Sequence, residues 1–189
     1  LGRHQVDNAG LAIQLCDLYC QSKQLPLLTK EQIDTALLAT NWPGRMEQIS
    51  HQPRILLDGA HNPHAMERLT GTLNQHYPDL DKKILFSCIQ TKSLEEMVGQ
   101  LKQVPKSQLI LTNFADPRSF SKEKMAALAC EQGLNYADWQ AFLEIYLKAE
   151  HRDDELLLIT GSLYFLAQVR AYIIDKEKES RSEYGHEEN

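Results

Sequence analysis

The sequence contains no apolar run that approaches the roughly 18 residues expected of a membrane-spanning helix, and no signal-peptide pattern opens it. It also lacks the Walker loop G-x-x-x-x-G-K-(S/T), the dinucleotide fingerprint G-x-G-x-x-G and the zinc-protease pattern HExxH. We therefore expect a cytoplasmic protein with no membrane segment and no phosphate cradle of its own. The chain begins LGRHQVDNAG, without a methionine, so we expect it to be part of something longer.

Basic residues are outnumbered, because 20 Lys and Arg face 26 Asp and Glu, and the net charge is −6. This balance argues against general nucleic-acid binding, although a local basic pocket for an anionic ligand is compatible with it. Hydrophobic residues make up 42% and charged residues 24% of the chain, as in ordinary globular proteins. With 189 residues we expect one domain, or one domain and part of another, with a substantial core.

Cysteine is scarce, and the four cysteines are scattered at Cys16, Cys20, Cys88 and Cys130. We expect them to be reduced and buried, as in a cytosolic protein, rather than joined in disulfides. Cys16 and Cys20 are one helical turn apart, but that spacing alone does not define a zinc site.

Two helices are predicted before residue 45. Apolar residues at helical spacing indicate the first, over 7–22. Thr29 and Gln32 form the pattern of a capping box, so a second helix follows Thr29. It must end before Pro43, because the residue before a proline is pushed out of helical geometry. These two helices lack a core of their own.

The rest of the chain alternates between short apolar strands and amphipathic helices. Strands are predicted at 54–58, 83–89, 108–114 and 155–160, and helices at 63–77, 93–104, 121–133, 139–149 and 162–175. This alternation is typical of a mostly parallel sheet with helices on both faces, so the predicted fold class is a Rossmann-like α/β domain. We expect the α/β domain to span 46–175, between the helical part at 1–45 and a disordered polar tail at 176–189.

The stretch ILLDGAHNPHAM, residues 55–66, runs from the end of a predicted strand into the start of a helix. In open α/β sheets, ligands bind at the carboxyl ends of the strands, and Asp58 occupies such a position. Gly59 permits a tight turn, and Asn62 followed by proline suits a helix start. The pattern fits an ordinary strand, turn and capped helix. It also fits a site in which Asp58 and His61 face an anion beside a helix N-terminus.

A metal site built from His61 and His64 is not favoured by the pattern. The two histidines are three residues apart across a helix start, and no third ligand is evident. We therefore predict no metal site in this chain and interpret His64 as an ordinary residue of the first helical turn.

The stretch TGSLYF, residues 160–165, has a similar architecture, since a glycine turn joins a strand to Ser162 at a helix start. Ser162 is either a simple N-cap or, with the amides that follow it, a contact for a bound carboxylate. A serine-hydrolase elbow has the pattern G-x-S-x-G, and Tyr164 stands in place of its second glycine, so a hydrolase is not predicted.

Arg45 and Asn8 are candidate ligand contacts outside these two motifs. Arg45 follows proline and glycine in the loop NWPGR, residues 41–45. A loop arginine is usually solvated, but one between two parts of a chain could bind a phosphate bidentately. Asn8 lies at the start of the first helix, where an N-cap is the default interpretation.

Four motifs, in this order, resemble a known family: GRHQVDNAGLAI, WPGRME, ILLDGAHNPHAM and LLLITGSLYF. Together they are similar to the last third to half of folylpolyglutamate synthase, in the bifunctional form also called dihydrofolate synthase, a member of the Mur-ligase superfamily. The resemblance covers nearly the whole chain apart from the tail. The DGAHNP form resembles the folate branch, because muramyl ligases more often carry a tyrosine before the AH pair.

The resemblance implies an ATP-dependent ligase that joins L-glutamate to folate or dihydropteroate through an acyl phosphate. In this family an N-terminal ATPase domain with a P-loop binds most of the ATP and Mg²⁺, and a Rossmann-like Mur-ligase C-terminal domain binds glutamate. Residues 1–45 would be the end of the ATPase domain and 46–175 the glutamate-binding domain, in a monomer that binds neither nucleic acid nor membrane.

Matching the motifs residue by residue implies the ligand contacts. Asn8 would contact the adenine part of ATP, Arg45 would contact its phosphates, and Asp58 would complete the ATP contact. His61 would help hold the incoming glutamate, and Ser162 would bind its carboxylate. The resemblance implies no catalytic residue within this chain.

One loop departs from the family pattern, which usually has an aspartate-rich segment after the second strand of this domain. Here the loop is SCIQTKSLEE, residues 87–96, in which Lys92 is kept without the flanking aspartates, so Lys92 is given no role. Because the P-loop half is absent, we expect the isolated chain to be inactive. Two alternatives stay open: a non-catalytic nucleotide- or amino-acid-binding module, and a Mur-type ligase that acts on a peptidoglycan precursor.

Overall fold

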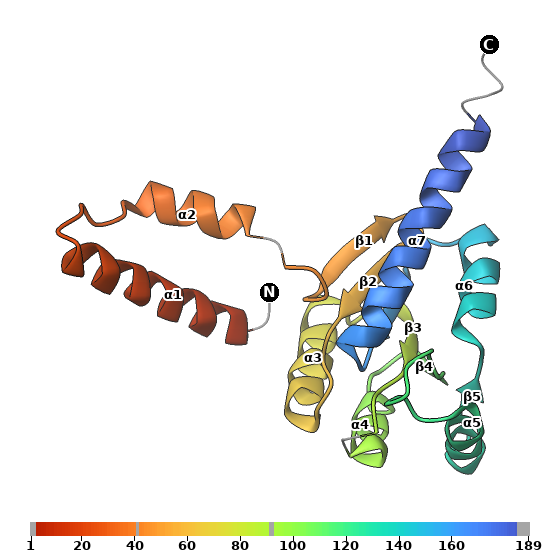
Figure 1. The fold of residues 1–189 in the computed structure, drawn as a ribbon. Helices are drawn as coiled ribbons and strands as arrows, with labels where there is room; N and C mark the ends of the chain where they lie inside the picture. Colours follow the sequence, from red (N-terminus) through yellow and green to blue (C-terminus); the bar gives the residue numbers. More distant parts are fainter. Residues whose placement is uncertain (1–2, 41, 91–92, 185–189) are drawn as a thin grey trace. The chain divides into compact units, whose positions relative to one another are not determined.

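The computed structural model describes residues 3–40, 42–90 and 93–184 of the chain (Figure 1). The chain divides into two compact units, Leu1–Pro43 and Gly44–Asn189. The first unit is helical, and the second is an α/β domain. Among the described helices, none is long and apolar enough to cross a bilayer.

The first unit consists of two helices, α1 (Arg3–Ser22) and α2 (Lys30–Ala39). The predicted capping box is confirmed, since the Gln32 amide donates to Thr29 Oγ1 over 3.3 Å and the Thr29 amide donates to Gln32 Oε1 over 2.9 Å. Several large apolar side chains of this unit are exposed: Val6, Leu11, Leu15, Leu18, Tyr19, Leu25, Leu27, Leu28, Leu37, Leu38 and Trp42. The two helices therefore build little core of their own.

A six-stranded sheet forms the centre of the second unit, with the strand order β1-β2-β6-β3-β4-β5. Its strands are β1 (Glu47–His51), β2 (Arg54–Asp58), β3 (Asp81–Phe86), β4 (Ser107–Leu111), β5 (Asn135–Tyr136) and β6 (Glu155–Thr160). All neighbouring strands are parallel except β1 and β2, which are antiparallel. The predicted mostly parallel α/β fold is therefore confirmed.

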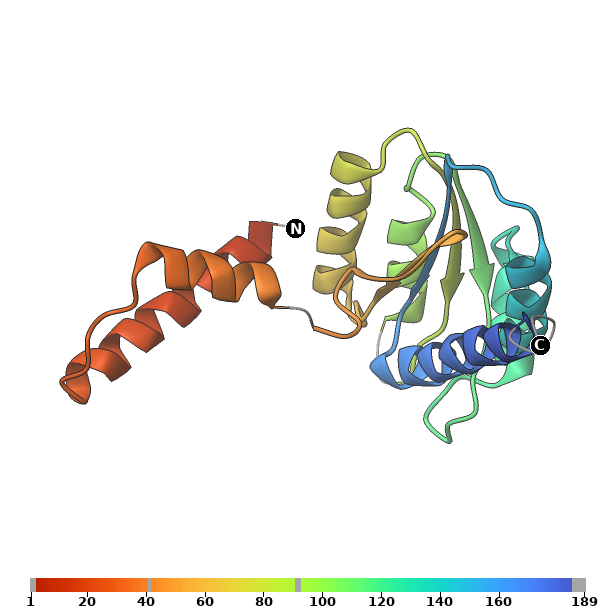
Figure 2. The ribbon, with the colours of Figure 1, turned by 90° about the horizontal axis from the view of Figure 1, so that it is seen from above.

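Helices cover both faces of this sheet (Figure 2). They are α3 (Pro63–His76), α4 (Leu94–Leu101), α5 (Lys122–Glu131), α6 (Trp139–Lys148) and α7 (Leu163–Tyr184). Successive side chains of a strand point to opposite faces. Accordingly, Leu158 packs with the core under α3, α4 and α5, and Ile159 packs with the core under α6 and α7. Both faces of the central strands are thus buried, which explains their unbroken apolar sequences.

The sequence does not predict β1 or β5. β1 is the polar edge strand EQISH, which has one apolar residue and pairs on one side only, so no apolar run marks it. β5 has two residues, which is too short for a pattern. β3 and β4 also end before the predicted limits, at Phe86 and Leu111, so the loops after them begin earlier.

Helix α7 continues to Tyr184, beyond the end predicted at residue 175. The tail predicted to be disordered from residue 176 is therefore corrected to helix as far as Tyr184, and residues 185–189 lie outside the described part. Lysine and glutamate are good helix formers, and Lys176 pairs with Glu179 over 2.8 Å. Composition alone suggested a solvated tail, but the same residues extend a helix that is already anchored by its apolar first half.

The four cysteines are free, as predicted. Their predicted burial holds for Cys20 and Cys88 and is wrong for Cys16 and Cys130, which are exposed. Burial and the nearby Glu95 charge raise the pKa of the Cys88 thiol to about 12, so this thiol stays protonated and inert.

Candidate functional site

Asp58, the last residue of β2, binds the loop that opens the second unit. Its Oδ2 accepts from the Met46 amide and its Oδ1 accepts from the Ala60 amide, each over 3.0 Å. The Gly59 amide also donates to the Gly44 carbonyl over 2.6 Å. These bonds hold the loop that carries Arg45 against the carboxyl end of β2, with the Arg45 side chain exposed.

Glu47 holds the same loop from its other side. Its Oε2 accepts from the Gly44 amide over 2.8 Å, and its Oε1 accepts from Arg170 on α7 over 2.9 Å. Glu47 is only 9% exposed, so the ion pair has a buried partner. The backbone is left-handed at Gly44 and Met46, with φ of 74° and 45°, which gives the loop its tight path.

His61 lies in the turn between β2 and α3, where its orientation is fixed by the backbone. Its Nδ1 is 2.7 Å from the Gly59 carbonyl, which can only accept, so Nδ1 carries the proton of that bond. In the neutral ring, Nε2 is then left as an acceptor on an exposed side chain. Asn62 follows as the N-cap of α3, accepting from the Ala65 amide over 2.9 Å.

The turn after β6 lies next to the turn after β2. Asp58 and Thr160 are partners in the parallel register, and Thr160 Oγ1 donates to the Ala60 carbonyl over 3.4 Å. Ser162 is 2% exposed at the start of α7, and its Oγ accepts from the Tyr164 amide over 3.3 Å. Because the oxygen is used in this way, the hydroxyl proton is what Ser162 can offer to a ligand.

Arg118, in the loop after β4, is a further residue of this edge that no sequence motif marks. Its Nε and Nη2 donate to the two carboxylate oxygens of Asp116 over 2.9 and 2.7 Å. Its Cζ lies 3.9 Å from the ring centroid of Tyr164, in the first turn of α7. The hydrogen bonds from Arg118 lower the pKa of Asp116 to about 2, so the pair is formed at any pH near neutrality. An oriented guanidinium thus lies beside the helix start that carries Ser162.

A metal centre has no candidate ligands in this region. The described ranges of the chain contain no group of three His, Cys, Asp or Glu side chains arranged to hold an ion. His64 faces Glu67 at 3.9 Å on the surface of α3, and both side chains are largely exposed. We therefore assign none of the described residues to a metal.

The predicted site residues are divided between the two units. Arg45, Asp58, His61 and Ser162 all belong to the second unit, where the clamped loop and the two adjacent turns bring them to one edge of the sheet. Asn8 lies exposed on α1 in the first unit. Lys92 lies outside the described residues.

Comparison with known proteins identifies the family of the second unit. Residues 44–163 match the family described as Mur ligase, glutamate ligase domain. The dihydrofolate synthase/folylpolyglutamate synthase of Bacillus subtilis is 25% identical over 170 residues, which cover 90% of this chain and 39% of that protein. The chain therefore belongs to the Mur ligase family and contains its glutamate ligase domain.

Two solved structures share the fold. A mutant folylpolyglutamate synthase of L. casei superposes with a TM-score of 0.68 at 28% identity, covering 92% of this chain and 37% of that one. The bifunctional folylpolyglutamate synthase/dihydrofolate synthase of Yersinia pestis, complexed with AMPPNP and a Mn ion, superposes with a TM-score of 0.65 at 24% identity, covering 79% and 35%. The chain thus spans well under half of these relatives.

Proposed function

We propose that this chain is the C-terminal part of an ATP-dependent amide ligase that adds L-glutamate to a folate, with dihydropteroate as the second substrate of the bifunctional form. The observation that carries the proposal is the grouping of Asp58, His61 and Ser162 in adjacent turns of a glutamate ligase domain. The folate enzymes among its relatives support the choice of substrate.

The proposed reaction has two steps. A carboxylate oxygen of the folate attacks the γ-phosphorus of ATP, and the bond to the bridging oxygen breaks, which gives an acyl phosphate and ADP. The amino nitrogen of L-glutamate then attacks the acyl carbon, loses a proton and expels phosphate to form the amide. Both steps concentrate negative charge on phosphate oxygens, so oriented cations and the exclusion of water favour them.

Each residue of the edge has a role in this proposal that suits its geometry. Arg45, exposed on the clamped loop, would bind ATP phosphates bidentately, and Asp58 would contact the nucleotide while it holds that loop. His61 would accept from the amino group of glutamate through Nε2, because Nδ1 is occupied by the Gly59 carbonyl. Ser162 would donate its hydroxyl proton to a carboxylate of glutamate.

The first unit fits the proposal as the end of the ATPase domain. Its helices expose apolar side chains such as Leu15 and Leu18, at 58% and 61%, although soluble proteins usually bury such stripes. The remainder of an ATPase domain would cover them, and Asn8 would contact adenine there. Mg²⁺ would be bound mainly by that remainder, and we assign none of the described residues to it.

The complete protein, assayed with ATP, a reduced folate and L-glutamate, tests the proposal. We expect ADP release in a one-to-one ratio with a folate product that is longer by one glutamate, detected by mass spectrometry. The 189-residue chain alone should release no ADP. Release of ADP with a UDP-muramyl substrate instead of folate would assign the protein to the peptidoglycan branch, and no release with either would favour a binding module.

Arg118 yields a sharper prediction for the same reaction. A guanidinium oriented by Asp116 and Tyr164 at this edge suits a carboxylate of glutamate. Replacing Arg118 by methionine in the complete enzyme is expected to raise the KM for L-glutamate roughly 10- to 100-fold. This change corresponds to the loss of about 1.5–3 kcal/mol, the contribution of a hydrogen bond to a charged group. The KM for ATP should stay unchanged.

The control for this measurement is Arg68→Met, which removes an exposed arginine from α3. It should leave both KM values as they are. If Arg118→Met and Arg68→Met have the same KM for glutamate, Arg118 does not bind the amino acid.

A further inference from the structure

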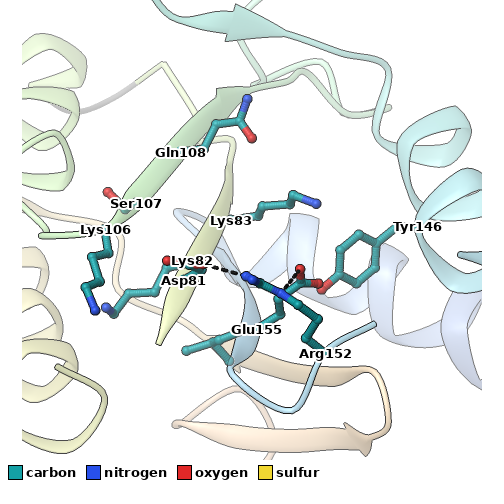
Figure 3. Close-up of a pocket in the computed structure, with 10 residues that line it drawn as sticks. Asp81, Lys82, Lys83, Lys106, Ser107, Gln108, Tyr146, Arg152 and Glu155 are labelled. Atoms are coloured by element: carbon teal, nitrogen blue, oxygen red, sulfur yellow. Dashed lines mark hydrogen bonds and ion pairs between the residues drawn. The ribbon is translucent and has the colours of Figure 1, made fainter. Parts of the chain in front are cut away.

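A cavity lies at the opposite edge of the sheet from the candidate site, at the amino ends of β3, β4 and β6 (Figure 3). We call it the amino-edge pocket, and it is lined by Asp81, Lys82, Lys83, Lys106, Ser107, Gln108, Tyr146, Arg152, Glu155 and Leu156. Its volume is about 370 Å³, within the range of roughly 300–1,000 Å³ that small-ligand pockets occupy. Since β6 has six residues, the two edges are roughly 17 Å apart at about 3.3 Å per residue.

The charge of this pocket is opposite to that of the protein. Four cationic side chains and two carboxylates line it, whereas the whole chain has a net charge of −6. The nearby carboxylates converge on one cation: Arg152 binds Asp81 over 2.6 Å, and Asp154 and Glu155 over 3.2 Å each. In the part of the chain that the structure describes, the three lysines of the pocket have no carboxylate within 4.0 Å. The three lysines are therefore left without a direct ion-pair partner.

The lysines differ in what they can offer. Lys82 is 3% exposed, and its Nζ donates to the carbonyls of Leu80 and Pro105 over 2.8 and 3.2 Å, so it is a structural residue. Burial, and then the charge of Lys106, lower its pKa. Lys83, one residue along β3, instead extends into the pocket with its Nζ 5.3 Å from the ring centroid of Tyr146 (Figure 3).

Two neutral polar side chains, Gln108 and Tyr146, line the pocket together with Lys83. Figure 3 shows the Gln108 side chain on one side of Lys83 and Tyr146 ahead of it. Burial, followed by the Glu155 charge, raises the pKa of Tyr146 to about 12, so its hydroxyl keeps a proton to donate. The Tyr146 ring is 5% exposed and packs against Phe142 and His151, which makes that wall of the pocket rigid.

We propose that the amino-edge pocket binds a compact oxyanion, either a phosphate or a carboxylate group, with the Lys83 ammonium as its charge partner and Gln108 as a second donor. A partly buried ammonium that lacks a carboxylate, next to neutral donors, favours an anion over a cation or a neutral ligand. The pocket is separate from the edge that carries Asp58 and His61, so this binding does not depend on the proposed ligase reaction.

Amide chemical shifts of the ¹⁵N-labelled 189-residue chain, titrated with inorganic phosphate and separately with malonate, test the proposal. Sodium chloride keeps the ionic strength constant. We expect saturable shifts at residues 81–83 and 106–108 with at least one of the two anions, and no saturable shifts at 58–62. Saturation by phosphate alone assigns a phosphate site, and saturation by malonate alone assigns a carboxylate site. Linear shifts with both anions, or saturation confined to 58–62, would overturn the proposal.

Two pocket variants and one matched control complete the experiment. Lys83→Met should weaken binding at least tenfold, and Gln108→Glu, an exposed position where folding is not at risk, should abolish it by adding a negative charge. Lys176→Met is the control, because Lys176 also lies over a tyrosine ring, 5.8 Å from the Tyr172 centroid, but on α7 outside the pocket. Unchanged binding in Gln108→Glu, or equal losses in Lys83→Met and Lys176→Met, would contradict the assignment.

Discussion

Replacing Asp58 or His61 by alanine in the complete ligase is expected to lower turnover at least ~10²-fold, the scale on which the loss of one charge-stabilising group acts. For Asp58 the structure supplies a second reason. Its two oxygens hold the amides of Met46 and Ala60, so its removal also releases the loop that carries Arg45. The measurement is kcat and KM for ATP and for L-glutamate at saturating folate. Near-normal kcat in both variants would remove these residues from the site.

Glu47→Gln separates the two effects expected from removal of Asp58, which are the loss of a nucleotide contact and the release of the loop that carries Arg45. Glu47 holds Gly44 in the same loop, and both of its carboxylate oxygens are already occupied, one by the Gly44 amide and the other by Arg170. If Asp58 contacts the nucleotide, Glu47→Gln should cost no more than about tenfold, the equivalent of one hydrogen bond, well short of the loss in Asp58→Ala. Equal losses in the two variants would mean that Asp58 acts only by positioning the loop.

His64→Ala is the matched control for His61. The two histidines are three residues apart and both are exposed, but only His61 is oriented by the Gly59 carbonyl, whereas His64 faces Glu67 at 3.9 Å. We expect His64→Ala to retain turnover. A KM for glutamate that rises in His61→Ala, with the KM for ATP unchanged, would support a contact with the amino acid rather than with the nucleotide.

The layered fold follows directly from the apolar pattern, and the exceptions have local causes. β2 and β6 occupy the predicted residues 54–58 and 155–160, because each is an apolar run that ends in polar residues at a turn. β1 is held by hydrogen bonds to β2, and of its five residues only Glu47 is buried, so EQISH carries no periodic apolar signal. The extension of α7 depends on continuation of an anchored helix, which composition does not encode.

The site was predictable as far as it follows from sheet geometry. Parallel strands end at one edge, which places both predicted turns, after Asp58 and after Thr160, on the same edge of the sheet. The pairing of Asp58 with Thr160 in the structure makes these two turns neighbours. The hydrogen bond from the Met46 amide to Asp58 was not predictable, because it depends on β1 folding back on β2. Arg118 was missed because it belongs to no motif, and its contact with Tyr164 depends on the path of the loop after β4, which no sequence pattern encodes.

Gly161→Ala is expected to destabilise the second unit strongly. Gly161 has a φ of 114°, a region that costs other residues about 1–3 kcal/mol. A Cβ there would collide with the Ser87 carbonyl oxygen and lie 2.7 Å from the Phe86 ring. Both neighbours are fully buried, so they cannot move aside freely, and overpacking adds about 1–3 kcal/mol. For a domain of this size the sum lowers the Tm by roughly 5–20 °C, measurable by thermal denaturation of the 189-residue chain.

Gly71→Ala provides the opposite expectation within the same domain. Gly71 is inside α3, and a Cβ at that position would meet nothing within 4 Å. Alanine is a better helix former than glycine by up to about 1 kcal/mol, so this variant should melt at or slightly above the temperature of the parent. If the Tm of Gly161→Ala equalled that of Gly71→Ala, the turn after β6 would not pack closely on Phe86 and Ser87. Because that turn leads into Ser162, the position of Ser162 in the proposed site would then lose its support.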